Sequence, residues 1–107
     1  MTNCGEESMG KEPRYHPLVA EDLALAVKHY DSISVDLGNR FRASVRSRVR
    51  FVTDHPESYA RIHEQLRVAM VERFPYVVVY EQGEGEVAIL GVFHAASDRE
   101  SWFQRAF

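Results

Sequence analysis

The order of the hydrophobic patterns constrains the fold of this chain more than any other feature. Apolar residues recur at helical spacing in the first half, over residues 20–33 and again over 34–54. From residue 59 onward the pattern changes to β-branched and aromatic runs, which predict strands over 66–72, 74–82 and 86–95. Helices followed by consecutive strands predict an α+β domain, in which an N-terminal helical hairpin packs on an antiparallel β-sheet.

The two predicted helices are amphipathic and are separated by a short joint. Their apolar stripes are Leu23, Ala26, Val27, Tyr30 and Ile33 in the first helix, and Leu37, Phe41, Val45, Val49 and Val52 in the second. Glu21 and Asp22 are expected to point outward. Ser34 is a candidate N-cap of the second helix, and Pro56 disfavours helical backbone just before it. The short joint predicts that the helices are antiparallel.

The three predicted strands form a meander. The first two are joined so closely around Arg73 that they should form a hairpin, and the glycine-containing segment 82–85 makes the next turn. Residues 76–80 are apolar on both faces, as in a central strand. Residues 14–19 are expected to add an edge strand, and a capping box from Ser97 to Glu100 to start a last helix. The predicted order is β-α-α-β-β-β-α.

Length and composition indicate one cytoplasmic domain, over residues 14–107, preceded by a flexible extension over 1–13, with Met9 as an alternative start. The extension is polar and does not resemble a secretory signal, and no apolar run is long enough to cross a membrane. Cys4 is the single cysteine, which excludes an intramolecular disulfide. The histidines lack zinc-site spacing, so neither a metal nor a cofactor is expected.

The charge of the chain argues against a protein that wraps nucleic acid. The formal net charge is −3, and part of the excess of acidic over basic residues lies in the extension. The domain itself is therefore close to neutral. RNA-wrapping domains are usually basic, because neutralisation of phosphates supplies most of their affinity. However, all but two of the 13 basic residues are arginine, whose guanidinium suits carboxylate and phosphate contacts. Local basic patches therefore remain relevant.

A set of residues in a specific order gives the chain a family resemblance. The set comprises Pro17, the segment 20–23, Tyr30, Phe41, His55 with Pro56, Arg67, the Arg-Phe-Pro-Tyr segment 73–76, Val79 with Tyr80, His94, and the segment 102–105. In this order and spacing the chain resembles the RelE/ParE toxins, and its ParE branch in particular. The resemblance implies an α+β toxin of a type II toxin–antitoxin, or plasmid stabilisation, pair. It also implies neutralisation by a cognate antitoxin encoded beside it, in a homodimer or in a heterotetramer with the antitoxin.

Two activities are known in that superfamily, and the sequence favours one of them. RelE-like members cut messenger RNA on the ribosome, whereas ParE-like members are associated with poisoning of DNA gyrase. Many cutting members carry an arginine where this chain has Val77, and often a further cation or tyrosine where it has Ala95 and Ala96. These departures favour gyrase as the target. A ribosome-dependent endoribonuclease is the alternative, and a degenerate toxin that binds only antitoxin is a further one.

If the chain is an enzyme, it would be a metal-independent ribonuclease, which needs a base, an acid and an arginine. The candidate catalytic residues are Arg67, Arg73 and His94; the candidate target-binding residues are these three together with Tyr76 and Trp102. Outward projection could expose both arginines on one concave face, although Arg67 could instead pair with Glu64 or Glu81.

Each remaining candidate also has a structural interpretation. His94 could be hydrogen-bonded to backbone or to Trp102, Tyr76 could pack in the core, and Trp102 could anchor the last helix.

A basic stripe on the second helix is the candidate antitoxin-binding surface. Arg42, Arg46 and Arg50 recur every four residues, which places them on one flank of the helix. The structural alternative is a solvated flank. The functional interpretation is a docking strip for an acidic antitoxin segment.

Overall fold

The computed structural model describes residues 12–105, so the predicted extension lies outside the described residues except at its last two positions. Its elements in chain order are β1 (Arg14–Tyr15), α2 (Val19–Asp31), α3 (Val35–Asp54), the 3₁₀ turn η1 (Pro56–Ser58), β2 (Arg61–His63), β3 (Leu66–Met70), β4 (Tyr76–Gly83), β5 (Glu86–His94) and α4 (Arg99–Phe103). The α+β class is confirmed. No helix in this part of the chain is long and apolar enough to span a membrane.

The helical hairpin forms as local signals predict. The Ser34 side chain caps α3 by accepting a hydrogen bond from the Leu37 backbone N–H at 2.9 Å. The helix ends at Asp54, ahead of Pro56. α2 has acidic residues in its first turn and basic residues in its last turn, as its macrodipole favours.

The sheet has five strands in the order β1-β5-β4-β3-β2 and is mixed rather than wholly antiparallel. β4 is central, as predicted, and pairs antiparallel with β3 and β5. β1 runs parallel to β5 at one edge of the sheet. The chain then crosses through α2 and α3 to the opposite edge, where β2 begins, and it returns to β1 strand by strand through β3, β4 and β5. β2 was not predicted, since three residues are too few to show an alternating pattern.

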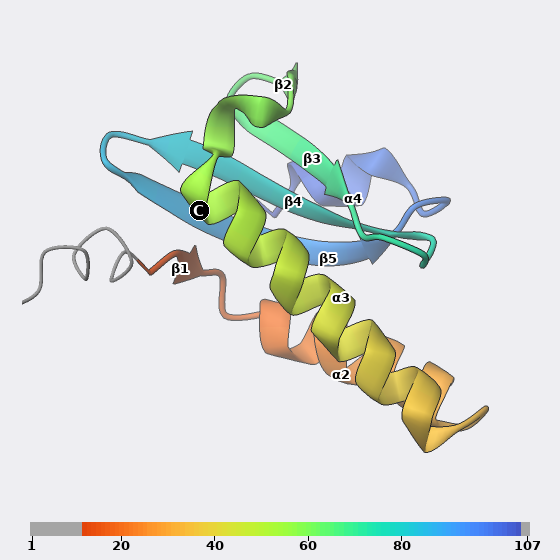
Figure 1. The fold of residues 1–107 in the computed structure, drawn as a ribbon. Helices are drawn as coiled ribbons and strands as arrows, with labels where there is room; N and C mark the ends of the chain where they lie inside the picture. Colours follow the sequence, from red (N-terminus) through yellow and green to blue (C-terminus); the bar gives the residue numbers. More distant parts are fainter. Residues whose placement is uncertain (1–11, 106–107) are drawn as a thin grey trace, which may run out of the picture.

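The sheet is covered on both faces (Figure 1). The α2–α3 hairpin lies across one face and α4 lies behind the other. The helix-facing core contains Phe41, Val52, Val78, Tyr80 and Ile89, all fully buried. Burial of each such side chain stabilises the fold by about 1.5–3 kcal/mol. The opposite core gathers around the Trp102 of α4.

Two local details differ from the sequence predictions. β3 ends at Met70 instead of continuing to residue 72, and Arg73 takes a positive φ of 73° in the β3–β4 turn. The N-cap of α4 is Asp98, whose side chain accepts a hydrogen bond from the Glu100 N–H. The Ser97 hydroxyl instead donates to the His94 carbonyl and accepts from the Trp102 indole.

Candidate functional site

An apolar groove of about 430 Å³ lies between α2 and α3, with β1 and β5 contributing to its lining. Val27, Val45 and Ile89 are buried at its base, whereas Ala20 and Ala24 are exposed on its α2 side. These two small side chains leave the α2 side of the groove open. The lining residues are Tyr15, Val19, Ala20, Leu23, Ala24, Val27, Arg42, Val45, Arg46, Val49, Ile89 and Val92.

The predicted basic stripe flanks this groove. Arg42 and Arg46 belong to its lining, and Arg50 lines a neighbouring cavity of about 550 Å³ between the end of α3 and the β4–β5 turn. All three arginines are exposed, and none forms an ion pair with a carboxylate within residues 12–105. Burial raises the pKa of Tyr15, Glu12 raises it further, and the positive charge of Arg50 opposes them. The groove therefore combines an apolar floor with a positively charged flank.

A second group of candidates meets at one end of the sheet. Tyr76 opens β4 and is the cross-strand partner of His94, which ends β5; their ring centroids are 5.2 Å apart. Arg73 lies in the turn just before them and is exposed. The His94 Nδ1 accepts a hydrogen bond from the Ala96 N–H, and the ring is otherwise exposed. Burial raises the pKa of Tyr76. The Tyr76 and His94 rings thus lie against each other, and the exposed Arg73 lies in the turn that leads into β4, but position 77 is valine and adds no cation.

Arg67 does not join this group, and the expectation that it projects outward with Arg73 is wrong. Its position in β3 puts it on the helix-facing side, where it is half-buried and Nη1 donates to the Tyr59 carbonyl. It forms no ion pair with Glu64 or Glu81. Strand alternation explains the difference, because Ala69 on the same side of β3 belongs to the helix-facing core.

Trp102 is placed as an anchor of α4. It is 2% exposed, its indole N–H donates to the Ser97 hydroxyl at 3.0 Å, and its ring lies near that of Phe93. A buried side chain cannot contact a target directly, which leaves Trp102 the structural role that its sequence context also allowed.

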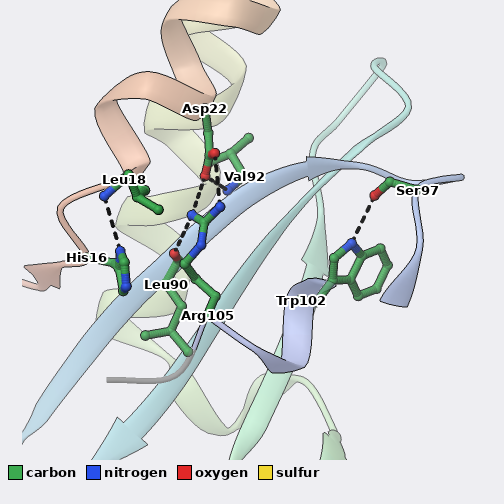
Figure 2. Close-up of polar contacts among 8 residues, drawn as sticks. All are labelled: His16, Leu18, Asp22, Leu90, Val92, Ser97, Trp102 and Arg105. Atoms are coloured by element: carbon green, nitrogen blue, oxygen red, sulfur yellow. Dashed lines mark hydrogen bonds and ion pairs between the residues drawn. The ribbon is translucent and has the colours of Figure 1, made fainter. Parts of the chain in front are cut away.

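The structure reveals an ion pair that sequence reasoning missed (Figure 2). The Asp22 carboxylate accepts from the Arg105 Nη1 at 2.8 Å and from the Val92 backbone N–H at 3.1 Å. Arg105 also donates to the Leu90 carbonyl and lies 4.8 Å from the ring centroid of Phe93. Asp22 and Arg105 therefore hydrogen-bond to backbone groups on the outer edge of β5, namely the Val92 N–H and the Leu90 carbonyl. This part of the edge lies beyond the residues that pair with β1. The expectation that Asp22 points outward is therefore wrong, since its side chain is only 14% exposed. The helical pattern could not indicate this contact, because the partners of Asp22 are 70 and 83 residues away in the sequence.

A further arrangement that the sequence did not indicate surrounds Tyr59. Arg48 of α3 donates from Nη1 to the Tyr59 hydroxyl at 2.8 Å, while Arg67 donates to the Tyr59 carbonyl. The Nε atoms of both arginines are buried without a hydrogen-bond partner. Within residues 12–105, no group of three His, Cys, Asp or Glu side chains could hold a metal ion.

Residues 14–99 match the family model described as ParE toxin of type II toxin–antitoxin system, parDE. The chain belongs to the ParE toxin family. Its fold is similar to that of a solved structure of the chromosomal ParDE toxin–antitoxin system from P. aeruginosa, with a TM-score of 0.68 and 18% sequence identity, covering 78% of this chain and 95% of that chain. No match was found among curated proteins.

The residues that match the family model include those of the groove, the arginine stripe and the group formed by Arg73, Tyr76 and His94. Arg105 lies beyond the matched residues. The chain is thus a toxin component of a type II toxin–antitoxin system, a context that includes an antitoxin partner.

Proposed function

We propose that the chain is a toxin that poisons DNA gyrase in the cytoplasm and is neutralised by an antitoxin seated in the α2–α3 groove. The proposed neutralisation by an antitoxin is supported by the apolar groove, which Arg42 and Arg46 flank, in a chain that belongs to the ParE toxin family. An amphipathic helix can bury its apolar face in such a groove, and acidic residues beside that face would meet the arginines. An antitoxin segment that folds on binding could cover this surface with few residues.

The sheet edges favour one site for an added antitoxin strand. The outer edge of β5 beyond β1 is occupied by Asp22 and Arg105. β2 pairs only with the first part of β3, so no strand of residues 12–105 lies along the outer edge from Val68 to Met70. Met70 is 53% exposed there. An extended antitoxin segment would therefore add along β3.

Gyrase is the favoured target because the chain lacks a full cationic catalytic group. Val77, Ala95 and Ala96 stand where many mRNA-cutting members of the superfamily carry a cation or a tyrosine, and the near-neutral domain does not favour binding of an RNA backbone.

A ribosome-dependent ribonuclease is the second candidate, and the Tyr76–His94 ring contact, next to the turn that carries Arg73, favours it. The histidine could exchange the proton, and the arginine could stabilise a phosphorane.

Induced expression in bacteria separates these functions. Chromosome breakage and translation are followed from the moment of induction, with and without the neighbouring antitoxin gene. The proposal expects DNA breaks before protein synthesis falls, and rescue by the antitoxin. Early loss of translation, with messages cut at ribosome-occupied codons, would refute gyrase poisoning. Antitoxin binding without any growth defect would identify a degenerate toxin.

The His94→Ala variant adds a direct control. A ribonuclease that uses His94 as its proton carrier should lose activity by about 10²-fold or more. A gyrase poison needs no proton transfer at this position and should retain its effect on DNA.

A further inference from the structure

The surface around Tyr59 holds more positive charge than the fold neutralises. Arg48 and Arg67 approach Tyr59 from α3 and from β3, and both guanidinium groups are partly buried. Each uses one Nη1 donor within the fold, and each leaves its Nε–H buried without an acceptor. Unsatisfied donors on buried charged groups are costly, so such groups are rare unless a further partner completes them.

No carboxylate of residues 12–105 completes this group. The ion pairs of the described chain join other side chains, and Glu57 contacts Gln82 instead. A third arginine increases the imbalance, because Arg61 of β2 is the cross-strand partner of Arg67. Directly opposed residues share a sheet face, and like charges in this position destabilise the pair. Three arginines therefore lie on this side of the fold, and no carboxylate of residues 12–105 forms an ion pair with any of them.

This group is separate from the antitoxin groove. Successive residues of an α-helix are rotated by about 100°, so Arg48 lies about 200° from both Arg46 and Arg50. The Arg42, Arg46 and Arg50 stripe flanks the α2 side of α3, whereas Arg48 reaches Tyr59 on the β2–β3 side. A helix seated in the groove would therefore leave Arg48 uncovered, whereas an antitoxin strand added along β3 would lie next to Arg67.

We propose that Arg48, Arg61 and Arg67 form an oxyanion-binding site whose ligand is a carboxylate of a protein partner that docks on the β2–β3 side of α3. Guanidinium groups bind carboxylates through paired N–H donors, and partial burial strengthens the attraction by lowering the local dielectric. A small side-chain rotation that turned either Nε–H outward would give it the acceptor that the fold lacks. A carboxylate is favoured over a nucleic-acid phosphate because the near-neutral domain lacks the basic excess that binding along a phosphate backbone usually requires.

Side-chain NMR of the arginine Nε–H groups tests this site directly. Buried Nε–H protons exchange slowly with water, so the Arg48 and Arg67 signals should be observable in the isolated protein. The probe is an end-capped tetraglutamate peptide, with inorganic phosphate and chloride compared at matched ionic strength. We expect the peptide to shift both signals saturably and at lower concentration than phosphate does. The absence of a saturable shift, or a stronger response to phosphate, would refute the assignment to a protein carboxylate.

Matched variants locate the binding. Arg48→Gln should raise the dissociation constant at least tenfold and Arg61→Gln at least threefold, while Arg40→Gln on the same helix should not change it. Arg61 is exposed, so its variant remains informative if Arg48→Gln does not fold. An affinity unchanged in both Arg48→Gln and Arg61→Gln would place the bound peptide elsewhere and overturn the proposal. Because the probe contains no antitoxin, this result is independent of the groove proposal.

Discussion

Replacing Asp22 by alanine should destabilise the fold by about 3 kcal/mol, far more than the loss of an ordinary surface carboxylate. Asp22 accepts hydrogen bonds from both Nη atoms of Arg105 and from the Val92 N–H. Both side chains of the pair are only 14% exposed. The substitution therefore leaves a largely buried guanidinium without its carboxylate, and an edge N–H of β5 without its acceptor.

The expected cost in unfolding free energy follows from the loss of the ion pair and the loss of the acceptor for the Val92 N–H. Removing one member of a buried ion pair costs about 3–5 kcal/mol, and a backbone donor left without a partner adds about 1 kcal/mol. Water can reach the remaining exposed surface of Arg105, which reduces the cost to about 3 kcal/mol. This is a large fraction of a total stability of about 5–15 kcal/mol.

Urea denaturation provides the assay. With a slope of about 1.5 kcal/mol per molar, the midpoint of Asp22→Ala should fall by about 2 M. The control is Asp36→Ala, which removes the exposed pair with Arg40 on α3 and should cost less than about 0.5 kcal/mol. An Asp22→Ala/Arg105→Met double variant should be less destabilised than the sum of its single variants. Equal midpoints for Asp22→Ala and Asp36→Ala would show that the pair does not hold the C-terminal segment on β5.

Other substitutions test the remaining assignments. Burial raises the pKa of Tyr80 to about 12, above its unfolded value of 10.0, so its contribution to stability is complete below pH 10 and is lost as the pH rises towards 12. Urea midpoints at pH 8 and 11.5 should therefore fall less in Tyr80→Phe than in the wild type; equal falls would contradict the burial argument. Arg73→Ala should change stability by less than about 0.5 kcal/mol and reduce toxicity, whereas Arg67→Ala should cost about 1–3 kcal/mol through the lost contact with Tyr59. Melting curves alongside growth assays check both, and a stability loss in Arg73→Ala that matches Arg67→Ala would refute the distinction. Trp102→Ala should cost about 3–5 kcal/mol by emptying the α4-facing core, and a near-wild-type melt would argue against its anchoring role.

The elements that the sequence predicts are those that local interactions determine. The Ser34 cap acts within one helical turn, Pro56 restricts the residue before it, and the run over 76–80 needs burial on both faces. Each of these signals depends on residues within a few positions, so the two helices and the three long strands could be recognised without tertiary information.

The features that were missed depend on contacts between distant parts of the chain. The parallel pairing of β1 joins Arg14 to Ala88, and β2 forms only because β3 offers it a partner. Asp22 turns inward because Arg105 and the β5 edge meet it, which a helical pattern cannot indicate.

In the candidate site, too, local spacing could be predicted, whereas contacts between distant residues could not. The four-residue spacing of Arg42, Arg46 and Arg50 predicts their common flank, but the groove beside them exists only after α2, α3 and β5 pack together. Tyr76 and His94 meet through strand register, and Arg48 meets Tyr59 across the end of α3. Helical spacing can therefore identify a surface, whereas the surroundings of a side chain require the folded chain.

The association kinetics of the chain with its cognate antitoxin test the central claim most directly. Arg42, Arg46 and Arg50 are reversed to glutamate together, and Arg40→Glu is the single-charge control on the same helix. Steering by the stripe should make the wild-type rate at least about tenfold faster than that of the triple variant at low salt, with the rates converging at high salt. Circular dichroism must show that the triple variant is folded. An unchanged association rate and salt dependence in the folded triple variant would contradict an antitoxin docked along this groove.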